Sequence, residues 1–118
     1  MNEQMFKDRT RKFALRVIQL VETLPRGRAA DVLGRQLLRC PTSVGANYRA
    51  ACRGKSTADV IAKLGIVEEE ADESVYWMEL LVDSGVLLAE RVAALMKEAD
   101  ELIAMTVASI KTLRSRRQ

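Results

Sequence analysis

The sequence predicts an all-α protein, an up-and-down four-helix bundle built as one domain over residues 1–118. Four segments repeat apolar residues at spacings of three and four, and no segment shows the alternation of a strand. Ala, Leu, Val, Glu, Arg and Lys make up the bulk of the chain, whereas Gly and Pro number only 6 and 2. The connections between the four segments are short, which is typical of helices that pack side by side as antiparallel neighbours.

The first two helices are bounded by breakers of helical structure. The first is expected from Arg9 to Leu24, where Pro25 stops it. The second is expected from Ala29 or Asp31 to Cys52, with Pro41 in its middle. Because proline has no amide donor, this segment is either kinked at Pro41 or divided there, with Pro41 in the first turn of its second half.

The third and fourth helices have the clearest patterns. The third opens at Ser56, an N-cap with Asp59 three residues on, and is expected to reach Asp83. The fourth is expected from Leu88 to Leu113, with apolar residues spaced three and four apart over three heptads. The third also carries apolar residues beyond its main stripe, including Tyr76 and Trp77, which we interpret as core or interface anchors. A second apolar side on one helix indicates a second packing partner, and another subunit is one such partner.

Several classes of function are excluded by composition. The chain has no histidine, so it has no Ser-His-Asp or Cys-His nucleophile and no histidine metal motif. Cys40 and Cys52 would lie about 18 Å apart along one helix, too far for a disulfide, and are interpreted as small apolar residues. No apolar run approaches the roughly 20 residues of a membrane span, and no signal peptide is visible. We therefore expect a cytoplasmic, non-enzymatic protein. We expect it to have no catalytic residue, to bind no cofactor or metal, and to make no contact with a membrane.

Charge is divided unevenly along the chain. Residues 1–55 hold 12 Lys and Arg against 4 Asp and Glu, whereas residues 56–110 hold 3 against 12. One interpretation is that oppositely charged helices are neighbours, within a subunit or between subunits. The other is that the basic helices bind the phosphates of RNA or DNA. We call their nine candidate residues the basic surface: Arg9, Arg11, Lys12, Arg16, Arg35, Arg39, Arg49, Arg53 and Lys55.

The run EEEADE at residues 68–73 is the densest acidic stretch. Carboxylates alone can bind a hard cation, so a metal enzyme using Glu69, Asp72 and Glu73 is one hypothesis. A solvated helix face, or pairing with arginines of the second helix, is the alternative.

Asn47 interrupts an otherwise apolar seam that runs along the second helix from Leu33 to Ala51. A buried amide requires a hydrogen-bond partner, and Ser43 one turn earlier or a carboxylate of the third helix, Asp72 or Glu73, would provide one. A lone polar residue in such a seam sets the register and the number of partners, so we interpret Asn47 as architectural.

Residues 38–81 read LRCPTSVGANYRAACRGKSTADVIAKLGIVEEEADESVYWMELL. This stretch, with its Ser43-x-x-x-Asn47 pair, resembles the central region of the 23S rRNA-intervening sequence proteins, and the resemblance extends over nearly the whole chain. It implies a small bacterial four-helix bundle that assembles as a ring-like homo-oligomer, with a pentamer as the expected count. Many relatives carry Glu where this chain has Ala50, and no catalytic residue is transferred.

A more distant similarity is to the accessory variability determinant proteins of diversity-generating retroelements, where a basic pentameric barrel contacts nucleic acid and a reverse transcriptase. Because residues 1–55 carry this excess of positive charge, we predict a nucleic-acid-binding role, with RNA as the expected ligand, or an accessory role for the basic surface. The alternative is a purely structural assembly module whose charges pair one subunit with the next.

Overall fold

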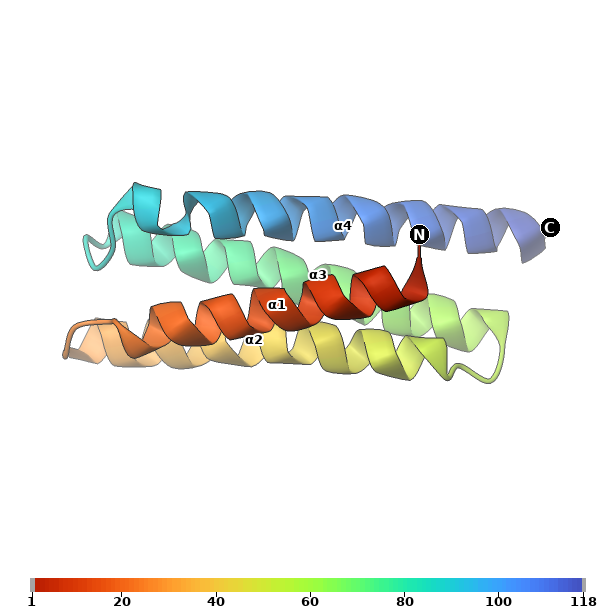
Figure 1. Ribbon diagram of the computed structural model, residues 1–118, viewed down its shortest axis with the longest axis horizontal. Helices are drawn as coiled ribbons and strands as arrows, with labels where there is room; N and C mark the ends of the chain where they lie inside the picture. Colours follow the sequence, from red (N-terminus) through yellow and green to blue (C-terminus); the bar gives the residue numbers. More distant parts are fainter. Residues whose placement is uncertain (1, 118) are drawn as a thin grey trace.

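Four long α-helices, joined by short turns, form the whole fold (Figure 1). The computed structural model describes residues 2–117, in which α1 spans Glu3–Glu22, α2 Arg28–Cys52, α3 Thr57–Asp83 and α4 Ala89–Arg117. No strand forms between residues 2 and 117. The all-α prediction is therefore confirmed. The helices lie along one axis in a rod of 50 × 20 × 20 Å.

Each helix packs mainly on the next one in sequence. The α2–α3 pair has the most extensive contact, followed by α3–α4 and α1–α2, whereas α1 touches α4 over a much narrower strip. The α1 helix is also the shortest, so the C-terminal turns of α4 and the turn between α2 and α3 extend beyond its first residue (Figure 1, right). At that end, α2, α3 and α4 border an open hollow of about 500 Å³.

The first helix begins six residues before the predicted start. The Asn2 side chain caps it, because its Oδ1 accepts a hydrogen bond from the Met5 amide at 2.9 Å. Phe6 then packs fully buried against Tyr48 of α2, with ring centroids 4.5 Å apart in an edge-to-face arrangement. The predicted start lies too far along the chain because polar residues surround Phe6 in the sequence. They obscure the apolar stripe of α1, which begins at Phe6.

The second helix continues through Pro41 without a break, so of the two alternatives, a kink or a division at this proline, the division is wrong. Pro41 is buried on the side of α2 that faces α1, where it lines the hollow between these two helices. Thr42 donates its hydroxyl to the carbonyls of Leu38 and Arg39, at 3.1 and 2.8 Å, within the turn that lacks the proline amide.

Two turns depend on specific residues at their ends. Ser56 caps α3 as predicted, since its Oγ accepts from the Asp59 amide at 3.1 Å, and Asp59 in return accepts from the Lys55 amide. Gly54 lies so close to α3 that a β-carbon there would be 2.3 Å from Cγ2 of Val60. Gly85 ends α3 with φ +81°, the left-handed conformation that favours glycine.

The core contains the apolar stripes of all four helices and few polar groups. Its buried hydroxyls, on Thr10, Ser74 and Thr106, each donate to a carbonyl of the preceding turn at 2.7–3.0 Å. Over the residues described, none of the helices carries an apolar stretch of membrane-spanning length. The largest fully buried side chains are Phe6, Phe13, Leu37, Met78, Leu81 and Leu102.

Candidate nucleic-acid interface

Two residues of the basic surface form ion pairs with other helices of the same subunit, and Arg9 is the first of them. It lies on the α4-facing side of α1, where its Nε donates to Oε2 of Glu98 at 3.0 Å and its Nη2 to the other carboxylate oxygen. Its Nη2 also lies 3.7 Å from Glu101, and its Nη1 contacts the Met105 sulfur. The hydrogen bond to Glu98 raises the pKa of the Arg9 guanidinium. This cation stabilises the narrow α1–α4 contact and is not available to a ligand.

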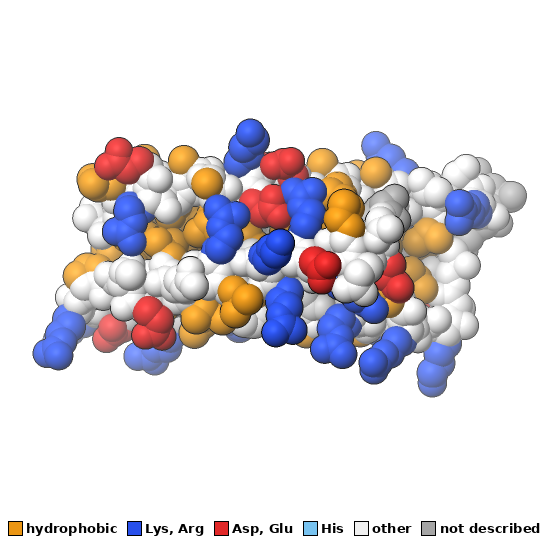
Figure 2. Space-filling model, in the orientation of Figure 1, with side chains coloured by type: hydrophobic (Ala, Val, Ile, Leu, Met, Phe, Trp, Pro, Cys, Tyr) orange, Lys and Arg blue, Asp and Glu red, His pale blue; other side chains and the backbone are white. Residues whose placement is uncertain are grey.

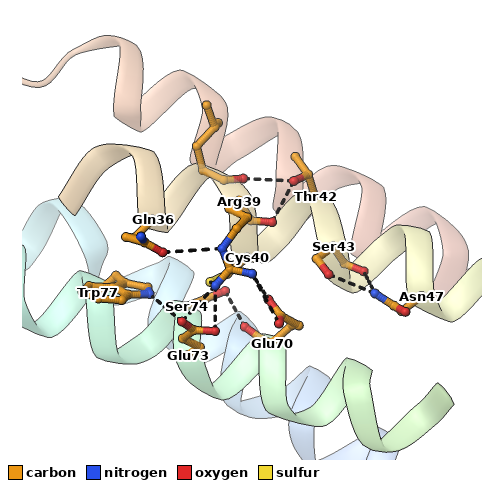
Figure 3. Close-up of polar contacts among 11 residues, drawn as sticks. Gln36, Arg39, Cys40, Thr42, Ser43, Asn47, Glu70, Glu73, Ser74 and Trp77 are labelled. Atoms are coloured by element: carbon orange, nitrogen blue, oxygen red, sulfur yellow. Dashed lines mark hydrogen bonds and ion pairs between the residues drawn. The ribbon is translucent and has the colours of Figure 1, made fainter. Parts of the chain in front are cut away.

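Arg39 is the second, and it joins α2 to α3 (Figure 3). Its Nη2 lies 2.9 Å from both carboxylate oxygens of Glu73 and 3.4 Å from the Cys40 sulfur, while its Nη1 lies 3.1 Å from Glu70. The Trp77 indole donates to the same Glu73 at 3.2 Å. We call these five residues the Arg39 cluster. One interpretation of the charge pattern, pairing of basic and acidic helices within the subunit, thus holds at two contacts.

The Arg39 cluster also controls ionisation. The hydrogen bonds from Arg39 hold the pKa of Glu73 below its usual value. Burial raises the pKa of the Cys40 thiol to about 12, so this thiol stays protonated near neutral pH. Cys40 is buried, Cys52 is half-buried, and both are free thiols.

The structure does not bring together the three carboxylate side chains expected to bind the ion of a metal enzyme. Glu69 and Asp72 are exposed, and among residues 2–117 the acidic and sulfur atoms with metal-ligand spacing are those of Cys40, Glu70 and Glu73, within 4.8 Å of one another. The Arg39 guanidinium bonds all three of these groups. A protein cation therefore already satisfies this site.

The other seven residues of the basic surface are exposed, and they form no ion pair with any residue that the structure describes. They are found in α1, in α2 and in the turn that follows α2. Lys and Arg side chains spread over α1 and along the lower edge of the molecule in Figure 2. The seven residues are Arg11, Lys12, Arg16, Arg35, Arg49, Arg53 and Lys55.

The seven exposed cations do not form one patch. Lys12 and Arg16 follow Arg9 by three and seven residues, so they lie on the side of α1 that faces α4. Arg11 lies on the opposite side of α1, where it faces α2. The basic surface of α1 is therefore divided between two sides of the helix.

A groove of about 570 Å³ runs between α1 and α2, and we call it the α1/α2 groove. Lys7, Arg11 and Arg49 line it, with Asp8 as the one carboxylate among its lining residues. Asp8 accepts a hydrogen bond from the Gln4 amide at 3.0 Å. Lys7 was missed by the sequence analysis, although its position one turn before Arg11 is a usable signal. The groove thus brings together three cations that form no ion pair among the described residues.

The α2 side of the groove continues as a row of arginines. Arg35 and Arg49 are fourteen residues apart and lie on one side of α2, and Arg53 directly follows the last residue of this helix. At 1.5 Å per residue the row is about 27 Å long. Arg35 lies at its far end, where it lines a smaller hollow of about 300 Å³ beside the turn between α1 and α2.

Asn47 does not occupy the core position that the sequence analysis assigned to it. It is half-buried, and the adjacent Tyr48 takes the core position with 5% of its surface exposed. Of the partners considered, Ser43 is the one used: the Asn47 amide donates to its carbonyl and its hydroxyl, both at 2.9 Å (Figure 3). The buried seam steps four residues from Val44, to Tyr48, whereas the predicted seam stepped three residues from Val44, to Asn47.

The outer side of α3 carries the predicted aromatic anchors. Tyr76 is 53% exposed and contacts half-buried Trp77 edge to face, with ring centroids 5.0 Å apart. Ile66 on the same helix is 40% exposed. Exposed Asp72 forms no ion pair among the described side chains. Tyr76 is thus a surface residue, not a core residue.

The fold and its charged surface together define a small four-helix bundle with a basic α1–α2 pair. The chain belongs to the 23S rRNA-intervening sequence protein family, whose model matches residues 3–108. It is also similar to a crystal structure of a protein of unknown function in the S23 ribosomal protein family from Bacteroides thetaiotaomicron. The two are 34% identical with a TM-score of 0.86, over 94% of this chain and 99% of that one. A comparison with curated proteins found no significant match.

Proposed function

We propose that the protein is a non-enzymatic, cytoplasmic homo-oligomer that binds RNA through the exposed cations of α1 and α2. The observation that carries this proposal is the set of seven exposed basic residues left without an ion pair among the described residues, after Arg9 and Arg39 are paired. If the charge pattern served only to bring the helices of one subunit together, more of these cations would bond to α3 or α4. Unpaired cations on a helix surface attract phosphates and release their counterions on binding.

The family name supports RNA as the nucleic acid. The chain belongs to a family described by the intervening sequences of 23S rRNA, and its solved relative is assigned to an S23 ribosomal protein family. One description names ribosomal RNA and the other a ribosomal protein family, which supports RNA over DNA as the ligand in our proposal.

The exposed apolar residues of α3 support self-association. Tyr76 and Ile66 expose 53% and 40% of their surfaces, and Leu88 beyond α3 exposes 67%. An aromatic residue with one side against Trp77 and the other in solvent is suited to an interface, because it buries a large area at little cost in side-chain entropy. We propose the ring-like homo-oligomer, with five subunits, that the family resemblance implies.

The second candidate is a structural assembly module in which the unpaired cations bind the acidic helices of another subunit. Exposed Glu69 and Asp72 of α3 favour it, because neither is paired with a cation among the described residues. Sedimentation velocity at about 0.1 and about 1 M salt separates the two functions, since exposed ion pairs are screened at high salt. Oligomers that dissociate at high salt support the module, whereas oligomers that persist support the RNA-binding protein.

Fluorescence anisotropy with a labelled, structured RNA tests the proposal directly. We expect saturable binding by the wild-type protein and at least about tenfold weaker binding when Arg35, Arg49 and Arg53 are all changed to Ala. Circular dichroism checks that the helices are retained in the triple variant. Equal affinity of the two folded proteins would refute the assignment of these arginines to the ligand.

A further inference from the structure

We infer that the ligand is double-helical nucleic acid, held by its backbone phosphates along the α1/α2 groove without contact to the bases. This inference rests on the proposed function and specifies the class of nucleic acid. It follows from which side chains the groove contains, which side chains it lacks and how its cations are spaced.

Aromatic residues are absent from the groove. Proteins that hold single strands without sequence preference stack the bases on aromatic side chains. Of the five aromatic residues in the chain, Phe6, Phe13 and Tyr48 are in the core, with at most 5% of their surface exposed. The other two, Tyr76 and Trp77, lie on α3. The basic surface therefore has no platform on which an unpaired base can stack.

Each neutral polar side chain of the groove already donates a hydrogen bond within the protein. The Thr42 hydroxyl donates to the carbonyls of Leu38 and Arg39, and the Gln4 amide donates to Asp8. Reading a base edge in sequence-specific fashion requires side chains free to make such bonds. The groups that remain are the charged nitrogens of Lys7, Arg11 and Arg49, which suit phosphate oxygens.

The spacing of the cations fits a stiff ligand. Lys7 and Arg11 are one helical turn apart on α1, about 6 Å, and the row from Arg35 to Arg53 follows α2 for about 27 Å. Both rows are held by helices, apart from Arg53, which directly follows the last residue of α2. A duplex is straight on this scale, since its persistence length is about 150 base pairs. Its phosphates meet two fixed rows without the loss of chain entropy that a flexible strand suffers.

The floor of the groove is open because residue 45 is glycine. A β-carbon at Gly45 would lie 3.6 Å from Oγ1 of Thr10, an ordinary contact distance, so alanine fits there. A longer acidic side chain at the same position would occupy part of the groove, which Lys7, Arg11 and Arg49 also line. Gly45→Glu therefore blocks the groove without removing any cation, and Gly45→Ala is its control.

The test compares a 20-base-pair RNA duplex with a single strand of the same length that forms no structure, by fluorescence anisotropy. The groove variant Lys7→Ala/Arg11→Ala has a matched control in Lys111→Ala/Arg114→Ala, because each removes one Lys and one Arg, and the control residues are exposed on α4, outside the basic surface and the groove. We expect the wild-type protein to bind the duplex at least about tenfold more tightly than the single strand. The groove variant and Gly45→Glu should each lose about tenfold or more in duplex affinity, whereas the control variant and Gly45→Ala should lose less than about threefold.

The outcomes separate the two levels of the proposal. Binding to no nucleic acid would overturn the proposed function and this inference with it. Binding to the single strand as tight as to the duplex would overturn this inference and leave RNA binding in place. An equal loss in the groove variant and in its matched control would do the same, because the phosphate contacts would then lie outside the groove. A duplex of DNA included in each series shows whether the sugar contributes.

Discussion

Arg39 of α2 places a single guanidinium nitrogen 2.9 Å from both carboxylate oxygens of Glu73 on α3. This bond joins the two helices that share the most extensive contact. A second ion pair, between Arg9 and Glu98, crosses the α1–α4 contact. The two ion pairs explain part of the opposite charge of the two halves of the chain, because each joins a basic helix to an acidic one. The cations that remain are exposed, and on them the proposed function depends.

The Arg39–Glu73 bond predicts a pH dependence of stability. Arg39 holds the pKa of Glu73 below its ordinary value of 4.5. A carboxylate with a lowered pKa in the folded state contributes stability above its unfolded pKa, and this contribution is lost as pH falls through the folded pKa. Urea unfolding of wild-type and Glu73→Gln proteins between about pH 7 and pH 3 measures the effect. As pH falls, the free energy of unfolding should decrease less in the variant than in the wild type.

The effect should be modest, because the side chains of Arg39 and Glu73 are 49% and 35% exposed. Glu69→Gln is the control: Glu69 is exposed and unpaired within the described chain, so its variant should follow the wild-type profile. Parallel profiles for Glu73→Gln and wild type would show that the bond does not stabilise the fold.

The early start of α1 makes Phe6 a core residue. Phe6→Ala removes the ring that packs against Tyr48 and should lower the free energy of unfolding by about 3–5 kcal/mol. Met5→Ala, at a neighbouring residue with 40% of its surface exposed, should change it by less than about 1 kcal/mol. Chemical denaturation measures both. A Phe6→Ala protein as stable as Met5→Ala would mean that α1 is not docked before residue 9.

Two glycines should respond oppositely to the same substitution. A β-carbon at Gly54 would lie 2.3 Å from Cγ2 of Val60, so Gly54→Ala should destabilise the protein by about 1–3 kcal/mol. Gly65 lies within α3 with nothing within 4 Å of such an atom, so Gly65→Ala should stabilise it by up to about 1 kcal/mol. Thermal melts of the two variants distinguish them, and a stabilised Gly54→Ala protein would argue against the close packing of the α2–α3 turn.

Asn47 has an amide that bonds only within α2 among the described residues, to Ser43. Asn47→Leu should therefore leave the melting temperature unchanged or raised, while the loss of this polar group broadens the range of oligomers. Native mass spectrometry measures the distribution. Ser43→Ala retains the carbonyl acceptor and should leave assembly as in wild type. Loss of folding in Asn47→Leu without a change in assembly would refute the architectural role.

Periodicity and capping were sufficient to predict the class of fold and the bounds of α3. Ser56 and Asp59 mark its start by their chemistry alone, and Gly85 marks its end. The start of α1 was not predictable in the same way, because Phe6 is recognised as core only once Tyr48 is placed opposite it.

The candidate site was predictable as a set of basic residues but not as an arrangement. Arg9 and Arg11 are two positions apart, yet one bonds Glu98 of α4 and the other lines the α1/α2 groove. Which side of a helix meets an acidic partner depends on how the helices are ordered around the bundle. The choice between Asn47 and Tyr48 as the core residue has the same origin, because a step of three or four residues fits the same period.

The most direct test of the account is the salt dependence of RNA binding. Each phosphate contact contributes about −0.9 for a duplex to the slope of log affinity against log salt concentration. With four or more contacts from the seven exposed cations, affinity should fall about a hundredfold or more between about 50 and about 200 mM salt. A flat salt dependence, or no binding even at the lower salt concentration, would contradict the claim that these cations bind phosphate.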